Sequence, residues 1–240
     1  MKAPDGVISV TLAEQDVAMV SHAPLPFALS REHTMAMPLR RHWTTADVRA
    51  LTREDRPWPR YELLDGELLV TPAPQWPHQT AAFEICVVLD AYVMRERIGS
   101  AIMSPSELEL RPGTITQPDV FVVPIGMQIT GLVPQWSDIK SLLLAVEVLS
   151  PSSLRTDRVV KRDFYLANGV AEYWIVDLDA RMFEVWRPQQ ETPSVLQAEL
   201  AWQPLDRAPL VIDLVALFDR IDTKWRQISG QSRSGRTPPP

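Results

Sequence analysis

Residues 142–177 constrain the fold more than any other part of this chain, with the sequence LLLAVEVLSPSSLRTDRVVKRDFYLANGVAEYWIVD. Residues 142–149 form a nearly unbroken apolar run, which is typical of a strand covered on both faces. Pro and Ser residues that can start a helix follow, Asn168 and Gly169 can end it, and EYWIVD predicts a second strand. Such a crossover is normally right-handed, with parallel strands. The segment therefore predicts an α/β core.

One carboxylate, Glu147, interrupts the first apolar run, and burying an unpaired charge is costly. Lys161 lies on the expected helix beside its apolar stripe, one turn after Asp157. Because the crossover returns the helix over the sheet, we expect Lys161 to lie near Glu147. Two structural alternatives stay open: a buried ion pair between Glu147 and Lys161, or a solvated Lys161 paired with Asp157 at i,i+4 spacing.

A second carboxylate, Asp119, follows Pro118 at the start of a strand expected at residues 115–123. Carboxylates on adjacent strands offer the oxygen ligands that Mg²⁺ prefers, and the backbone carbonyl of Val148 can complete the metal shell. The lysine can then position or deprotonate a water, or stabilise the charge that develops on a phosphate. Alternatively, Asp119 bonds backbone amides at the start of the strand.

Other polar side chains are weaker candidates for the same site. Glu62, on the first arm of the hairpin, can add a further carboxylate to the site. His78, at the start of a helix, can contact a phosphate or only form local hydrogen bonds. Tyr165, one turn after the lysine, can contact a phosphate or only pack at the helix edge. Basic side chains on the expected exposed side of the helix form either a solvated face or contacts to a DNA backbone; they are Arg155, Arg158 and Arg162.

The segments before the central unit predict two helices and a hairpin. A helix is expected to begin at Thr44 or Thr45 and to end at residue 51. The dipeptide Asp65-Gly66 between two alternating arms predicts a hairpin with strands at 60–64 and 67–71. A long helix is expected at 78–98 and to end at Gly99. Its predicted core stripe consists of Phe83, Val87, Ala91 and Met94.

Further strands and one short helix complete the expected domain. Strands are predicted at 101–103, 107–110, 115–123, 182–186 and near 196–202, with a short helix near 214–218. Residues 126–139 are expected to form a loop. We divide the chain into a disordered extension at 1–41, one domain at 42–226 and a disordered tail at 227–240.

The composition indicates an ordinary globular protein of the reducing cytoplasm. The chain has 240 residues, 45% hydrophobic and 22% charged, without an apolar run long enough to span a membrane. No secretory signal peptide is recognised at the N-terminus. The single cysteine, Cys86, excludes an internal disulfide framework and a multi-cysteine metal site. The net charge of −6 argues against tight binding of nucleic acid through the bulk field, although a local basic cleft remains compatible with it.

At these residues the chain resembles the Uma-type restriction endonuclease family of the PD-(D/E)XK nuclease superfamily. The resemblance rests on Pro118-Asp119, on Glu147-Val148-Leu149 followed by SPS, on Asp157, Lys161, Tyr165 and GVAEYWIVD, and on the upstream YELLDGELLVTPAP with His78 and WTTADV. It covers roughly residues 43–218. It implies a restriction-endonuclease-like fold with a mixed sheet flanked by helices, and Mg²⁺-dependent hydrolysis of DNA, with Mn²⁺ as a possible substitute.

Carried over by position, Asp119 and Glu147 are the metal ligands and Lys161 is the catalytic lysine. The chain departs from the superfamily pattern at Leu149, where the usual lysine stands two residues after the Glu. The resemblance therefore implies that the lysine has moved onto the helix. The alternatives are a silent nuclease-fold module that binds DNA or protein, and a hydrolase of another phosphodiester. A homodimer is expected if both strands of a duplex are cut.

Overall fold

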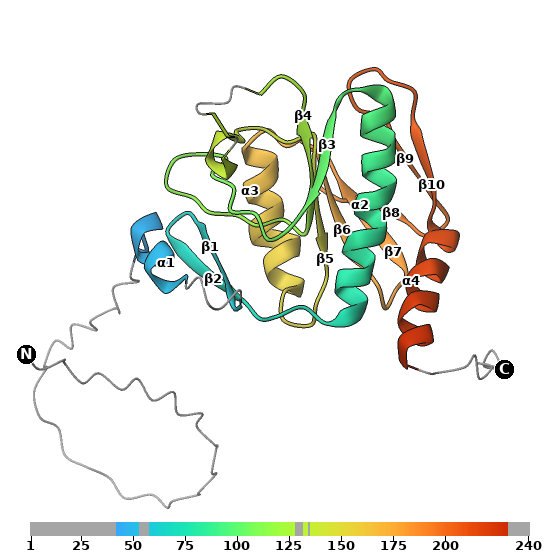
Figure 1. Cartoon of the computed structure of the whole chain (residues 1–240), viewed down its shortest axis with the longest axis horizontal. Helices are drawn as coiled ribbons and strands as arrows, with labels where there is room; N and C mark the ends of the chain where they lie inside the picture. The colour runs from blue at the N-terminus through green and yellow to red at the C-terminus, as the bar shows by residue number, and fades with distance from the viewer. Residues whose placement is uncertain (1–41, 53–57, 128–131, 134, 230–240) are drawn as a thin grey trace, which may run out of the picture. The chain divides into compact units, whose positions relative to one another are not determined.

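The computed structural model describes residues 42–52, 58–127, 132–133 and 135–229. The extension expected at 1–41 and most of the expected tail lie outside these residues. A six-stranded mixed sheet forms the centre of the described part (Figure 1). Its strands are, in spatial order, β3 (Gly99–Met103), β4 (Val120–Pro124), β5 (Leu144–Val148), β6 (Glu172–Asp177), β7 (Met182–Trp186) and β8 (Ser194–Leu196).

The central crossover has the form that the sequence predicts. β5 and β6 pair in parallel, with Glu147 opposite Ile175, and the other pairs in the sheet are antiparallel. The helical connection consists of a π-helix, η2 (Thr156–Lys161), and the short α3 (Arg162–Ala167). The fold class, a mixed sheet flanked by helices, is therefore confirmed.

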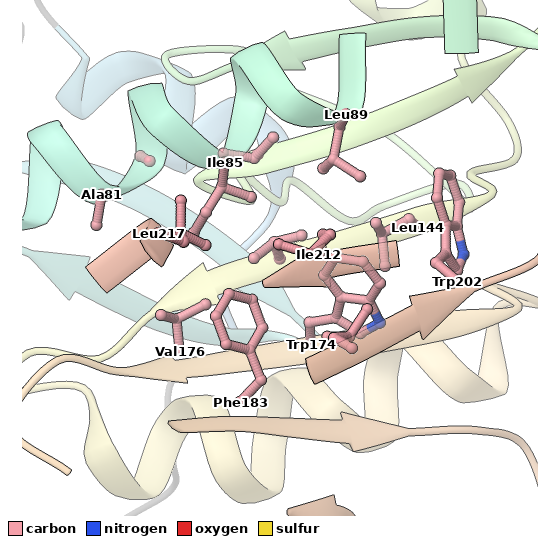
Figure 2. Packing of buried hydrophobic residues seen from close by; sticks show 14 of the residues in the cluster. Ala81, Ile85, Leu89, Leu144, Trp174, Val176, Phe183, Trp202, Ile212 and Leu217 are labelled. Carbon is pink, nitrogen blue, oxygen red and sulfur yellow. The ribbon is translucent and has the colours of Figure 1, made fainter. Parts of the chain in front are cut away.

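Helices cover both faces of the sheet (Figure 1). Successive residues of each strand point to opposite faces, so each strand packs against helices on both sides. The helices α2 (Trp76–Glu96) and α4 (Leu214–Ser229) lie on one face, where Ile85 and Leu217 pack with Trp174 and Phe183 (Figure 2). On the other face α3 packs through Phe164 and Tyr165 against alternate residues of the same strands. Val146 and Val148 pack on the face covered by α2 and α4. Glu147 lies between them on the strand, so its side chain points to the opposite face, toward η2 and α3.

Two small antiparallel sheets and a capped helix accompany the main sheet. The predicted hairpin is present as β1 (Arg60–Leu64) and β2 (Glu67–Thr71), and the predicted first helix is α1 (Thr45–Leu51), with Thr44 and Asp47 forming a capping box. The strand expected near 196–202 is divided: β8 joins the main sheet, whereas β9 (Glu199–Trp202) pairs with β10 (Leu210–Asp213).

The prediction for the core face of α2 was wrong. Phe83, Val87 and Met94 are 49%, 48% and 59% exposed. The helix packs instead through a different stripe, composed of Ala81, Ala82, Ile85, Leu89, Tyr92 and Val93. Apolar residues occur on several sides of this helix, so the helical period permits more than one stripe.

The end of α2 also differs from the prediction. The helix ends at Glu96, the following C-cap residue Arg97 adopts a left-handed conformation, and Gly99 belongs to β3. A Cβ at Gly99 would collide with the carbonyl oxygen of Val123 on β4. The glycine is therefore required by the close approach of two strands, and not by the end of the helix.

Three other boundaries are corrected. Residues 107–110 form no named strand, and Leu108 makes one isolated bridge to Thr116. The strand expected at 115–123 starts at Val120, because Pro118 cannot donate to a ladder. The last helix runs through Ser229, so residues 227–229, expected in the tail, are helical. The loop at 126–139 contains a short 3₁₀ turn, η1 (Trp136–Asp138). Within the described residues, no helix has the length and apolar character required for a membrane span.

Candidate active site

A pocket of about 850 Å³ opens where several segments meet at one end of the main sheet. Its walls come from β1, the loop between β2 and α2, the end of β5, the turn into η2 and the turn after β6. Asp119, Glu147 and Lys161 all line this pocket. The structure thus brings together the three residues that the sequence singles out, although they are up to 42 positions apart.

Lys161 lies at the centre of a buried charge cluster. Its Nζ is 2.8 Å from Glu62 Oε2, 3.1 Å from Glu147 Oε1 and 3.8 Å from Asp157 Oδ1. Burial alone would lower the pKa of this lysine, but the three carboxylates outweigh it and hold the pKa well above its usual value. Lys161 is therefore an ammonium group at neutral pH.

The π-helix turns both Asp157 and Lys161 toward the sheet, and both are buried. One turn later Tyr165 is fully buried, and its hydroxyl donates to Glu147 Oε1 at 3.2 Å and lies 2.7 Å from Thr116 Oγ1. The tyrosine ring packs beside Tyr173, with ring centroids 5.2 Å apart. Tyr165 therefore orients Glu147 through this hydrogen bond, and it is not among the residues that line the pocket.

Asp119, directly before β4, is held in place by contacts to α2 and β5. Its Oδ2 is 3.0 Å from His78 Nε2 and accepts the Val148 amide at 2.9 Å, while its Oδ1 lies 3.6 Å from Arg60 Nη1. Burial alone would raise the pKa of Asp119, but His78, Lys161 and the Val148 amide outweigh it and lower the pKa. Asp119 is therefore ionised.

The backbone of Val148 also faces the pocket edge. In an extended strand the amide and carbonyl of one residue point to the same side. Leu149 donates to Val176 on β6, so the groups of Val148 point the other way, toward Asp119 and beyond the start of β4. Its carbonyl is thus directed to the side on which Asp119 lies.

For two of the buried carboxylates, Glu147 and Asp157, the attraction of Lys161 does not offset the cost of burying their charge. Burial and the neighbouring carboxylates outweigh Lys161 and raise the pKa of Glu147 well above its usual value. Burial likewise raises the pKa of Asp157 to about 6, against opposing contributions from Lys161 and Ser153, and Asp157 Oδ1 has no hydrogen-bond partner. Burial and mutual repulsion therefore oppose the ionised forms of these two carboxylates, and a bound cation would relieve both effects.

Oxygen ligands for a cation come from the residue before β4 and from the end of β5. Asp119 Oδ1 and Glu147 Oε2 receive no hydrogen bond from the described residues, and the Val148 carbonyl is directed to the same edge. Carboxylate and carbonyl oxygens fit the preference of Mg²⁺. Across the described ranges, no group of three His, Cys, Asp or Glu side chains is arranged to hold a metal, so waters and substrate oxygens would have to complete the shell.

Glu62 and Arg60 are more central than the sequence suggests. Glu62, which we expected to contribute less than Asp119 and Glu147, is the carboxylate nearest to Lys161 and accepts the Gln117 amide at 2.8 Å. Arg60 was not a candidate, yet it is 7% exposed, stacks on Trp58 and reaches toward Asp119. The available signal was that positions 60 and 62 share one face of a strand.

The sequence predicts that Arg155, Arg158 and Arg162 lie together on one exposed basic face. The structure does not show such a face. Arg158 lines the pocket and bonds Glu184 at 2.7 Å and Asp177 at 3.3 Å. Arg162 is paired with Asp163 and lies over the Trp186 ring, 4.6 Å from its centroid. Arg155 alone is exposed without an ion pair among the described residues. Acidic partners therefore neutralise two of the expected DNA contacts.

Comparison with known proteins gives a family and a fold. The model of the Uma2 family, described as "Putative restriction endonuclease", matches residues 45–214. The crystal structure of a "putative nuclease belonging to DUF820" from Anabaena variabilis matches with a TM-score of 0.59 and 24% identity, covering 75% of this chain and 99% of that chain. The type IIG restriction endonuclease BpuSI matches with a TM-score of 0.32 and 13% identity, over 65% of this chain and 17% of that one, which is too distant to carry an argument. No curated protein matches significantly.

Proposed function

The chain belongs to the Uma2 family of restriction-endonuclease-like proteins, and on this premise we propose that it is a metal-dependent deoxyribonuclease acting in the pocket described above. The observation that carries the proposal is that Asp119, Glu147 and Lys161 are all buried and all line this one pocket. Strongly perturbed pKa values beside a specific charge partner in a cleft are typical of functional sites.

We assign the metal to Asp119, Glu147 and the carbonyl of Val148, with Mg²⁺ as the expected ion and Mn²⁺ as its substitute. When bound, such an ion polarises a phosphate oxygen and lowers the pKa of a coordinated water. His78 and the Val148 amide hold the Asp119 carboxylate in place, and Tyr165 does the same for Glu147. The chain thus supplies both proposed ligands already oriented.

Lys161 is assigned an electrostatic role. Because carboxylates hold its pKa well above the usual value, it carries a proton that it does not readily release. It therefore cannot serve as the base that activates water. An ammonium fixed 3.1 Å from a proposed metal ligand is suited to stabilise the charge that develops on the phosphate during attack.

The competing function is a catalytically silent module that binds DNA or protein. One observation favours it: Lys161 is already surrounded by Glu62, Glu147 and Asp157, as in a structural ion-pair network. Under this alternative the chain binds no divalent metal, and substitutions at Glu147 or Lys161 chiefly lower the melting temperature.

The test is cleavage of supercoiled plasmid by the purified protein in Mg²⁺ or Mn²⁺, beside Glu147→Gln and Lys161→Ala. The matched control is Glu84→Gln, because Glu84 is also buried and paired with basic side chains but lies on α2 outside the pocket. We expect metal-dependent cleavage that both site variants abolish and the control retains. Folding of each variant is checked by its melting temperature. A folded wild-type protein that cuts in neither metal contradicts the proposal.

A further inference from the structure

The exposed side of α2 carries a continuous stripe of uncharged residues. We call the α2 stripe the set Trp76, Thr80, Phe83, Val87, Ala91 and Met94, which recur at three- and four-residue spacing. Its four large members are 48–59% exposed, and none of the six is charged. The opposite side of the same helix is anchored to the sheet through Ile85, Leu89 and Tyr92, so the stripe is presented on a rigid element.

A hollow of about 350 Å³ lies beside one end of this stripe. It is lined by Trp76, Gln79, Thr80 and Phe83 of α2 and by Lys224 and Gln227 of α4. The Lys224 ammonium lies 5.0 Å from the centre of the Phe83 ring, so its stem forms one wall. Met94, at the other end of the stripe, projects as an exposed and flexible apolar side chain.

The stripe is complementary to itself. If two copies of α2 pack antiparallel about a twofold axis at Val87, each Phe83 faces Ala91 of the second copy, and each Thr80 faces Met94. A large residue then meets a small one in both of these pairs, and Met94 enters the hollow lined by Trp76 and Phe83. A twofold interface requires this reciprocity, in which residue i contacts j and j contacts i.

The exposed area agrees with a small dimer interface. A fully exposed aromatic side chain offers 150–250 Å², so each half-exposed aromatic of the stripe contributes roughly 100 Å². With Val87 and Met94 included, the exposed apolar area of the stripe is roughly 300 Å² per copy. Two copies with about 60% apolar interface then bury roughly 1,000 Å² in total, near the lower limit of a specific interface.

We infer that the α2 stripe is the interface of a homodimer in which two α2 helices pack antiparallel about Val87. The inference rests on the surface alone and does not depend on the nuclease proposal. A monomeric chain can still cut DNA, and a dimeric chain can be silent. The two proposals therefore fail separately.

The first test is the mass of the full-length protein by sedimentation velocity over about 1–100 µM. Val87→Arg places two like charges on the twofold axis, and we expect it to weaken dimerisation at least tenfold. Val211→Arg is the matched control, because Val211 on β10 is 54% exposed and lies off the stripe. A monomeric wild-type protein over the whole range overturns the inference, as does a dimer that Val87→Arg leaves intact.

A second test locates the contact without relying on a disruptive substitution. The axes of packed helices lie about 8–10 Å apart, so residues that face each other on the twofold axis have Cα atoms much closer than the axes. The two Val87 Cα atoms are therefore within the reach of a disulfide. We expect Val87→Cys to form a covalent dimer on mild oxidation, in a Cys86→Ser background that removes the neighbouring native thiol. Val211→Cys in that background should remain uncrosslinked. Equal crosslinking of the two variants contradicts the assigned face.

Discussion

Asp157 is a buried acid whose charge opposes folding, and Asp157→Asn should therefore stabilise the protein at neutral pH. The carboxyl is 2% exposed, its Oδ1 lacks a hydrogen bond, and burial raises its pKa from 3.8 to about 6. At about 1.4 kcal/mol for each tenfold change in proton affinity, ionising it in the folded state costs about 3 kcal/mol. Asparagine keeps the shape, can accept the bond from Ser153, and removes this cost.

The sign of the pH dependence follows from the same values. The folded protein binds the proton more tightly than the unfolded chain, so the destabilisation is complete above pH 6 and is relieved as the pH falls toward 3.8. We expect Asp157→Asn to exceed the wild type by about 3 kcal/mol at pH 8, by about half of that at pH 5, and by less than about 1 kcal/mol at pH 4. For a domain of this size the gain at pH 8 corresponds to roughly 6–12 °C in melting temperature.

The assay is urea denaturation of wild type and Asp157→Asn at several pH values between 4 and 8. The control is Asp163→Asn, an exposed acid two residues beyond Lys161, which should change the free energy of unfolding by no more than about 0.5 kcal/mol. Destabilisation by Asp157→Asn at pH 8, or a difference that does not shrink as the pH falls, would refute the reasoning.

Three further substitutions test the charge cluster and one close contact between strands by chemical denaturation. Lys161→Met leaves buried carboxylates without their cation and should lower the free energy of unfolding by about 3–5 kcal/mol, a loss that Mg²⁺ should partly restore. Tyr165→Phe removes the hydroxyl between Glu147 and Thr116 and should lower it by about 1–2 kcal/mol. Gly99→Ala must displace strand backbone and should cost about 3 kcal/mol, against about 1 kcal/mol for Gly113→Ala, where a left-handed glycine faces open space; equal losses would contradict this account.

Local sequence patterns predicted correctly those elements for which the residues permit only one secondary structure. Asp65-Gly66 specified its hairpin, and the apolar run around Glu147 specified a buried strand with a parallel partner. The contact between Glu147 and Lys161 followed because the crossover has one normal handedness.

Other features depended on tertiary packing that no local pattern contains. The helix α2 is apolar on several sides, so only contact with the sheet decides that Ile85 is buried and Val87 exposed. The π-helix η2 has no simple sequence signature, yet it brings Asp157 and Lys161 to the cluster. Glu62 gains its place from the bridge between Leu63 and Ile115, which joins the hairpin to the segment before β4.

Titration of the purified protein with Mn²⁺ by calorimetry, without DNA, tests most directly whether the carboxylates of the pocket hold a catalytic cation. We predict that the wild type binds the metal, that Glu147→Gln abolishes this binding, and that Glu84→Gln binds as the wild type does. Binding that Glu147→Gln leaves unchanged, or a folded wild-type protein that binds no metal, would contradict the account and leave Lys161 as the structural partner of these carboxylates.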